Sequence, residues 1–387
     1  MRENKLKIIL ASAFLVIFSL TELYFIKPSL FYSQLTKVII FAALTLTLYL
    51  TLRLEYILLY GSVLYYLSLL LLVLTLFFGK GTVNRWLNLG IMQLQPSELA
   101  KLGLILILAK FLSDDKKPIK ARLIKASIYT FVPFVLTLLQ PDLGTSLTFL
   151  FIAFTMTWFS GLDPAITTII ILIPIAMLTS SHLISTLIFY FLVFIGLFIV
   201  KEPLYKKLVA ISILMTVSLS TPFVWYKVMK PYQRERLTAF LNPLKSKTRE
   251  GWQIYQAKIA IGSGGILGKG PGKGTQKGLA FLPAAHTDFI FSSIGEEFGF
   301  IGLLAIIVAF YLLFSGLLRI AELMDGQEKL ITIGVTAYFL FHFTVNIFSN
   351  LSLFPVVGIP LPFMTYGGSH LLTEMLSLLI IMKMEVF

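Results

Sequence analysis

Residues 56–78 read YILLYGSVLYYLSLLLLVLTLFF, and this stretch decides the class of fold. It carries no charged residue over 23 positions, enough for a helix to cross the roughly 30 Å hydrocarbon core of a bilayer. Inside a bilayer every backbone N–H and C=O must find a partner within the protein, and a helix supplies one for each. The stretch therefore predicts a transmembrane helix.

The same pattern recurs along the whole chain. Of its 387 residues, 57% are hydrophobic and 13% are charged, whereas soluble proteins have about a quarter charged. Twelve hydrophobic segments are predicted to be helical, near residues 7–26, 35–52, 56–78, 97–112, 123–139, 143–159, 165–179, 183–200, 207–224, 289–318, 328–350 and 367–384. We expect an all-α polytopic membrane protein with ten to twelve transmembrane helices, in which residues 1–387 form a single domain.

The placement of basic residues predicts the orientation in the membrane. Short links rich in Lys and Arg are usually cytoplasmic, and two such links carry Lys116, Lys117, Lys120, Arg122 and Lys125, and Lys201, Lys206 and Lys207. Both fit a cytoplasmic N-terminus. Alternation then places four polar links on the outer face, at 79–96, 140–144, 225–288 and 350–366. The large loop 225–288 is basic, which favours an anionic partner at that face, and the net charge of +13 does not by itself predict nucleic-acid binding.

Residues 85–101, RWLNLGIMQLQPSELAK, begin the fourth segment. Pro96 suits the first turn of a helix, and an acidic Glu98 in that turn is favoured by the helix dipole. Glu98 and Lys101 stand three residues apart on one face, where they can pair. Two interpretations stay open: a helix start with a compensating ion pair and an interfacial Arg85, or part of a functional site.

Residues 138–147, LLQPDLGTSL, interrupt two apolar runs. Irregular backbone at membrane depth is tolerated only when it is buried in protein or faces a wet cavity. Asp142 is therefore interpreted as a helix N-cap, as a carboxylate directed into such a cavity, or as both.

The large loop contains a second unusual stretch. Residues 252–261 have helical apolar spacing with a polar face, which predicts a helix lying in the interface. Seven glycines follow between residues 262 and 274, interleaved with Lys269 and Lys273. Glycines let backbone N–H groups converge on an anion, so the stretch is either a phosphate site or a flexible linker.

Residues 282–297, LPAAHTDFIFSSIGEE, place acidic groups where a span begins. Asp288 is either the N-cap of the tenth segment or a functional carboxylate, with His286 and Thr287 beside it. Glu296 and Glu297 lie about 12 Å further along the helix axis. They cannot face lipid cheaply, so they must pair or line a cavity. Gly295 and Gly299 should let a neighbouring helix approach closely.

A Pro- and Gly-broken segment, residues 350–370, follows the eleventh hydrophobic segment. It is interpreted as another rim of the same outer cavity. We expect His342 and His370 to be packing or hydrogen-bonding residues and not metal ligands, because no second histidine stands at ligand spacing.

These motifs together resemble the SEDS family (shape, elongation, division, sporulation). The resemblance covers residue 75 to the C-terminus and is closer to the elongation members than to the division members. It rests on Gln95-Pro96-Ser97-Glu98, Gln140-Pro141-Asp142-Leu143-Gly144, Gly251 through Gly278, His286-Thr287-Asp288-Phe289, Gly295-Glu296-Glu297, Pro360-Leu361-Pro362 and Tyr366-Gly367-Gly368-Ser369.

The resemblance implies a peptidoglycan glycosyltransferase that polymerises lipid II at the outer face of the bacterial cytoplasmic membrane, for cell elongation. Asp288 falls on the family's presumed catalytic position, and we expect it to act as general base in an inverting displacement. Arg85, Glu98, Lys101 and Asp142 fall on positions lining the family's central cavity. The residues expected to bind substrate are Arg85, Glu98, Lys101, Asp142, Arg234, Arg236, Lys269, Lys273, His286, Thr287 and Glu296.

Cofactors and partners follow from the same chemistry. A divalent cation, Mg²⁺ or Mn²⁺, would stabilise the leaving diphosphate, with Glu98 and Asp142 as its oxygen ligands; no organic cofactor is expected. The resemblance implies a class B penicillin-binding protein and other membrane proteins of the elongation complex as partners. A division-type polymerase, a lipid II flippase and a pure scaffold are the alternatives.

The chain departs from the family pattern at two places. SEDS proteins usually have ten spans, and the excess of two lies within residues 165–200, where an extra hairpin is predicted. His370 stands where the family usually has a second serine after Tyr-Gly-Gly-Ser, so no role is carried over to it.

Overall fold

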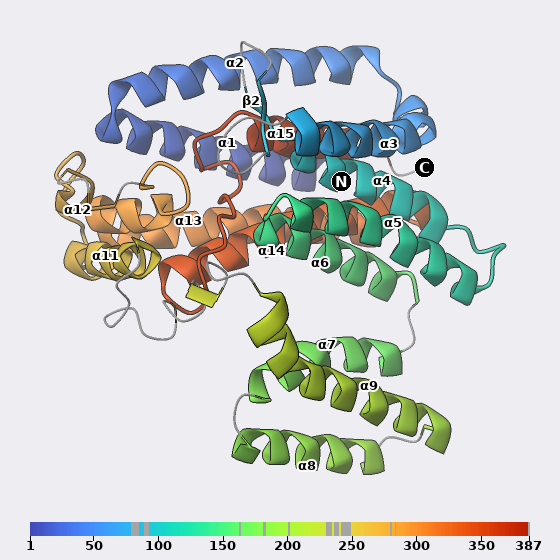
Figure 1. The fold of residues 1–387 in the computed structure, drawn as a ribbon. Coiled ribbons are helices and arrows are strands. Elements are labelled where there is room, and N and C mark those ends of the chain that lie inside the picture. Colours follow the sequence, from blue (N-terminus) through green and yellow to red (C-terminus); the bar gives the residue numbers. More distant parts are fainter. Residues whose placement is uncertain are drawn as a thin grey trace. The chain divides into compact units, whose positions relative to one another are not determined.

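The computed structural model describes residues 1–78, 85–88, 93–161, 164–180, 183–199, 202–229, 234–235, 240, 249–278, 281–282 and 284–385 (Figure 1). Each of the twelve predicted segments is a helix. They are α1 (Arg2–Ile26), α2 (Pro28–Thr51), α3 (Leu54–Phe78), α4 (Pro96–Leu112), α5 (Ile119–Leu139), α6 (Leu143–Phe159), α7 (Pro164–Thr179), α8 (Leu183–Ile199), α9 (Leu204–Phe223), α13 (Ile290–Leu323), α14 (Gly326–Asn350) and α15 (Ser369–Lys383).

Smaller elements lie in or beside the predicted outer links, and one of them confirms the helix predicted in the large loop. The predicted helix near 252–261 is α11 (Arg249–Gly264). The other short elements are η1 (Val224–Val228), α12 (Thr275–Gly278) and an antiparallel pair, β1 (Leu87–Asn88) and β2 (Gln93–Leu94), in which Leu87 faces Leu94.

Helix length and hydropathy confirm a polytopic all-α membrane protein. Within the described residues, seven helices are long and apolar enough to cross a bilayer: α1, α2, α3, α5, α13, α14 and the continuous stretch Leu204–Lys227. The helices α6 and α8 are apolar but shorter, and α4 and α15 have 17 and 15 residues. The lysines and glutamates on α4 and α15 need protein partners, because exposing a charged side chain to lipid costs several kcal/mol.

The contacts divide the chain into two compact units. We call Met1–Ser160 with Ala239–Phe387 the bundle unit, and Gly161–Thr238 the three-helix unit. The three-helix unit contains α7, α8 and α9, with α7 packed against both of the others. The single-domain organisation stays a prediction, because a compact unit of a membrane protein need not fold separately.

Helix α14 is the central element of the bundle unit. It packs against α4, α6 and α13, and its apolar 18-residue window is 78% buried, compared with 44% for that of α13. Any polar side chain on α14 must therefore be satisfied by neighbouring helices or loops.

Helix α13 is broken at Gly299, where φ is 63° and ψ is −159°. A side chain there would be strained, and its Cβ would lie 2.3 Å from the backbone nitrogen of Gly268. The neighbouring helix α11 packs against α13, and a Cβ on Gly264 would lie 2.0 Å from the carbonyl oxygen of Gly295. The predicted close approach at Gly295 and Gly299 is confirmed.

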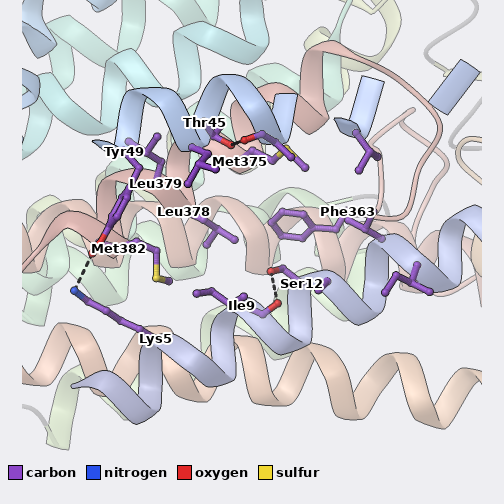
Figure 2. Close-up of a pocket in the computed structure, with 16 residues that line it drawn as sticks. Lys5, Ile9, Ser12, Thr45, Tyr49, Phe363, Met375, Leu378, Leu379 and Met382 are labelled. Carbon is purple, nitrogen blue, oxygen red and sulfur yellow. Dashed lines mark hydrogen bonds between the residues drawn. The ribbon is translucent and has the colours of Figure 1, made fainter. Parts of the chain in front are cut away.

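A cavity of about 700 Å³ lies between α1, α2 and α15 (Figure 2). Its lining is mostly apolar, with Ile9, Phe363 and Leu379 among the residues around it. Among the described residues that line it, Lys5 alone is charged. The Lys5 ammonium donates to the carbonyl oxygens of Met382 (2.8 Å) and Met384 (2.6 Å), at the C-terminal end of α15. Lys5 therefore caps a helix end whose dipole attracts a cation.

Candidate functional site

A stripe of polar side chains runs along α14 through the middle of the bundle unit. It consists of Tyr338, His342, Asn346 and Asn350, all buried. Residues four apart lie on the same face of a helix, so these four residues form one line about 18 Å long. This stripe was not predicted from the sequence, although a polar residue at every fourth position of an apolar helix is a visible signal. We call these four residues the α14 stripe.

The first part of the site is the predicted ion pair on α4, which is confirmed. The Lys101 ammonium lies 2.8 Å from Glu98 Oε1, and both side chains are almost fully buried. The Tyr338 hydroxyl donates to the other oxygen, Glu98 Oε2, at 3.3 Å, and the Lys101 ammonium lies 4.6 Å from the centroid of the Tyr338 ring. Both oxygens of Glu98 therefore accept hydrogen bonds.

His342 joins this ion pair to the segment that follows α14. Its Nε2 lies 3.2 Å from the Lys101 ammonium, and its Nδ1 lies 3.3 Å from the carbonyl oxygen of Pro360. Because an ammonium group can only donate, Nε2 accepts and Nδ1 carries the proton that bonds Pro360. His342 is a hydrogen-bonding residue, as predicted.

The C-terminal half of the stripe, Asn346 and Asn350, holds the backbone of Asp288. The side-chain amides of Asn346 and Asn350 both donate to the carbonyl oxygen of Asp288, at 3.1 and 2.8 Å. Asn350 also accepts from the backbone N–H of Ser292 at 3.1 Å, and Asn346 donates to the carbonyl of Ile359 at 2.9 Å. One helix face thus connects Lys101 to Asp288.

Asp288 is not the N-cap of α13. The N-cap residue is Phe289 and the helix begins at Ile290, so that alternative is wrong. The Asp288 side chain is half-buried, and its Oδ2 lies 3.9 Å from the place a Cβ would take on Gly358. A carboxylate in this position has protein on one side and remains partly accessible on the other.

The neighbours of Asp288 pack against the segment 354–366. The backbone N–H of Tyr366 donates to the carbonyl oxygen of His286 at 3.0 Å, and the Thr365 hydroxyl lies 3.5 Å from the carbonyl of Thr287. Burial lowers the pKa of His286 below its ordinary value. The predicted juxtaposition of the 282–288 and 350–366 segments is confirmed.

Asp142 and Arg85 form a second part of the site. Asp142 is the N-cap of α6, and its Oδ1 accepts from the backbone N–H of Thr145 at 3.2 Å. Its Oδ2 accepts from the Gln95 amide at 3.2 Å and lies 3.7 Å from the Arg85 guanidinium. Arg85 also donates to the carbonyls of Gln140 and Pro141, so it anchors the turn before α6.

Gly144, in the first turn of α6, lies against the 354–366 segment. A Cβ at Gly144 would lie 2.8 Å from the carbonyl oxygen of Val357. Glycine therefore allows α6 to approach the segment that also contacts His342 and Asp288.

The glycine-rich loop does converge on an anion, but the anions are the protein's own carboxylates. Glu296 accepts from the backbone N–H groups of Thr275 (2.8 Å) and Gln276 (3.1 Å to Oε2) and from the Lys269 ammonium (2.6 Å). Glu297 accepts from Gly272 N–H at 2.9 Å and Gly274 N–H at 3.1 Å. The predicted need of both carboxylates for partners is confirmed, and the loop returns to supply them.

The remaining predicted binding residues lie elsewhere. Lys273 is exposed. Arg234 belongs to the three-helix unit, and Arg236 lies outside the described residues. The structure thus brings together Glu98 with Lys101, Arg85 with Asp142, and Lys269 with Glu296. It places the backbone of Asp288 against the α14 stripe, and His286 and Thr287 against Tyr366 and Thr365.

The carboxylates predicted to bind a metal are already used. No group of three His, Asp or Glu side chains that could hold a metal occurs in the described part of the chain. Both oxygens of Glu98 and both of Asp142 accept hydrogen bonds, and each carboxylate faces a cationic side chain. This arrangement does not fit a divalent cation held by Glu98 and Asp142, and the Mg²⁺ or Mn²⁺ requirement stays a prediction.

Comparison with known proteins identifies the family. The model of the FtsW/RodA/SpoVE family, described as a cell cycle protein, matches residues 5–187 and 163–387. The two matches overlap at 163–187, which covers the first half of the predicted extra hairpin at 165–200.

Individual relatives agree. The chain is 33% identical to peptidoglycan glycosyltransferase RodA of Treponema pallidum, covering 82% of this chain and 81% of the relative. It is 35% identical to the probable peptidoglycan glycosyltransferase FtsW of Trichlorobacter lovleyi, covering 83% and 74%. A chain from a solved peptidoglycan synthase complex matches with a TM-score of 0.73 and 28% identity, covering 97% and 96%. This chain therefore belongs to the FtsW/RodA/SpoVE family of cell cycle proteins, the SEDS family.

Proposed function

We propose that this chain is a peptidoglycan glycosyltransferase that polymerises lipid II into β-1,4 glycan strands and serves cell elongation. The activity is the one named for its relatives of both the RodA and the FtsW type. The elongation role rests on the motifs in the large loop and the 355–362 segment, because identities of 33% and 35% to RodA and FtsW do not separate the two roles.

The observation that carries the proposal is the double anchoring of Asp288. Two buried amides hold its backbone carbonyl, while its side chain stays half-buried beside Gly358. A general base must be held within reach of a substrate hydroxyl without being sealed from it. In the proposed reaction Asp288 takes the proton from the 4-hydroxyl of the acceptor sugar as that oxygen attacks C1 of the donor.

The stereochemistry requires one base only. The donor phosphate is α and the product linkage is β, so a single displacement inverts C1 and needs no covalent intermediate. The C1–O bond to the diphosphate breaks as the new C1–O bond forms, and the diphosphate leaves with the electron pair. A cation must stabilise that charge.

The candidate cations are not equivalent. Lys101 and Lys269 each pair with a buried glutamate, whereas Lys273 is exposed on the glycine-rich loop. We assign the diphosphate contact to Lys273. Arg85 faces Asp142 and donates to two backbone carbonyls, so it anchors the Asp142 turn. Lys101 and Lys269 then hold the scaffold of the site.

The similarity to a chain of a solved peptidoglycan synthase complex supports the proposal that this protein works with a partner protein that crosslinks the new strands. We propose a class B penicillin-binding protein, acting together with other membrane proteins of the elongation complex. The outer location of the site in the cytoplasmic membrane would bring the growing strand to that partner.

The test is polymer formation by the purified chain. Lipid II is supplied with Mg²⁺, with Mn²⁺ or with a chelator, with and without the cognate transpeptidase, and the glycan products are separated on a gel. Polymer made by the wild type would support the glycosyltransferase activity. Transfer of lipid II across vesicle membranes without polymer formation would favour a flippase. If neither activity is seen even with the partner present, a scaffold is favoured.

The elongation role is tested separately, in cells. Depletion of this protein is expected to give round cells that still divide. Filaments with unfinished septa would instead assign it to division.

A further inference from the structure

The three-helix unit holds a cavity that the proposed polymerase reaction does not use. Its volume is about 580 Å³, within the roughly 300–1,000 Å³ range of ligand pockets. It is lined by α7, α8 and α9, and thus includes the hairpin predicted to be additional to the family's usual ten spans. All of its lining residues belong to the three-helix unit.

The cavity is apolar over most of its length. Leu172, Phe189, Val193 and Leu214 line its interior. Along α9 the lining runs from Tyr205 to Leu214, nine residues or about 14 Å of helix. One leaflet of a bilayer has a hydrocarbon depth of about 15 Å, half of the total. The cavity is therefore about as deep as one leaflet, and its apolar lining is suited to bind an acyl chain.

One end of the cavity is polar. Glu202, Tyr205, Lys206 and Lys207 line it at the beginning of α9, in the link that the positive-inside rule assigns to the cytoplasm. Glu202 pairs with Lys206 at 3.0 Å, so these two charges cancel. Lys207 is half-buried and makes no ion pair within the described part of the chain. Among the described residues, the polar end thus presents one cation without an ion pair, and a tyrosine belongs to the same lining.

We propose that this cavity binds one anionic phospholipid of the cytoplasmic leaflet, with an acyl chain between α7, α8 and α9 and the phosphate at Lys207. A Lys near the membrane surface attracts anionic lipid, and a tyrosine in the lining at the same end of the cavity suits the interface. The cavity at α1, α2 and α15 lacks this feature, because its Lys5 is already bonded to two carbonyl oxygens of α15. The lipid would fasten the hairpin to α9, the helix that leads into the large outer loop.

The experiment uses the full chain, purified in detergent and exchanged into phosphatidylglycerol or phosphatidylcholine, with bound lipid counted by native mass spectrometry. Leu197→Trp fills the cavity, and Lys207→Ala removes the cation. Phe198→Trp is the matched control, because Phe198 is on the same helix but is 83% exposed and does not line the cavity. Polymerisation of lipid II serves as the check on folding and is expected to persist in all three variants.

We expect one phosphatidylglycerol to be retained per wild-type chain, in preference to phosphatidylcholine. Leu197→Trp should lower its retention about tenfold, Lys207→Ala should weaken phosphatidylglycerol binding about fivefold without affecting phosphatidylcholine, and Phe198→Trp should match the wild type. Equal retention of the two lipids, or unchanged binding in Lys207→Ala, would overturn the proposal. Lys207→Ala changes only the polar end, so it keeps the test decisive if Leu197→Trp fails to fold.

Discussion

Two clusters of buried carboxylates in the bundle unit are satisfied in different ways. Glu98 is paired with side chains on rigid helices: Lys101 one turn away on α4, and Tyr338 on α14. Glu296 and Glu297 are bonded mainly to backbone N–H groups of the glycine-rich loop. The first arrangement ties two helices together. The second ties a loop to a helix, and it includes Gly272, whose φ of 73° favours glycine.

The difference predicts which property each cluster controls, the stability of the whole bundle or the order of the loop. Removing a partner from the Glu98 cluster leaves an unpaired charge inside the bundle, so the cost should appear as global stability. Removing a carboxylate from the loop cluster frees backbone groups that can turn to water, so the cost should be local to the loop. Lys101→Met and Glu296→Gln test this division directly, whereas Asn350→Ala and the pH dependence of His286 test the surroundings of Asp288. The largest expected effect comes first.

Lys101→Met is expected to destabilise the protein most. Methionine has a similar length but no charge, so Glu98 would stay buried without its cation. The free energy of unfolding should fall by about 3–5 kcal/mol, measured by denaturant titration in micelles. Adding Glu98→Gln to this variant should recover much of the loss. A loss below about 1 kcal/mol in the single variant would show that the pair does not hold the bundle.

Asn350→Ala should affect turnover more than stability. The change removes one of the two amides that hold the carbonyl of Asp288, and a displacement near 1 Å of a reacting group costs about 10²-fold in rate. We expect kcat to fall by about that factor with KM nearly unchanged. Phe348→Ala, at an exposed position of the same helix, is the control. Equal turnover rates in the two variants would contradict a role of the α14 stripe in positioning Asp288.

Glu296→Gln should loosen the glycine-rich loop. It keeps the shape of the side chain but replaces charge-assisted hydrogen bonds, each worth about 1.5–3 kcal/mol. Hydrogen exchange at the amides of Thr275 and Gln276 should become faster while the amides of α14 keep their protection. Glu322→Gln, at an exposed pair with Arg319, should change neither. Uniformly faster exchange would mean that this cluster also supports the whole bundle.

The smallest effect concerns pH. Burial lowers the pKa of His286 below the ordinary value of 6.5, so the unfolded chain binds this proton more readily than the folded one. Stability is therefore fully present above about pH 6.5 and declines as the pH falls toward the folded pKa. The melting temperature of His286→Asn should fall less steeply than that of the wild type between about pH 7.5 and 5.5. Parallel curves would contradict the assignment.

The sequence contains enough to predict the helices and the local pair. All twelve segments were recognisable because length and hydropathy alone define an apolar helix, and Glu98 with Lys101 because their spacing of three places them on one face. The α14 stripe was equally visible, since its period of four lies within one helix, but it was missed.

The partners of Glu296 and Glu297 could not be predicted in the same way. Their donors are backbone groups twenty or more residues earlier in the chain. A glycine-rich sequence does not indicate which anion its N–H groups will bind. The sequence indicated an anion site, and only the fold placed the chain's own carboxylates in it.

The central claim is that Asp288 is the base of the polymerisation reaction. The most direct measurement is the rate of glycan formation from lipid II by wild-type protein and by Asp288→Asn, both folded and both paired with the transpeptidase. Asparagine keeps the size and the backbone anchoring but cannot take a proton. The account predicts a loss of about 10²–10⁴-fold, with binding of lipid II retained. Polymer from the Asn variant at a rate within a few-fold of the wild type would contradict it.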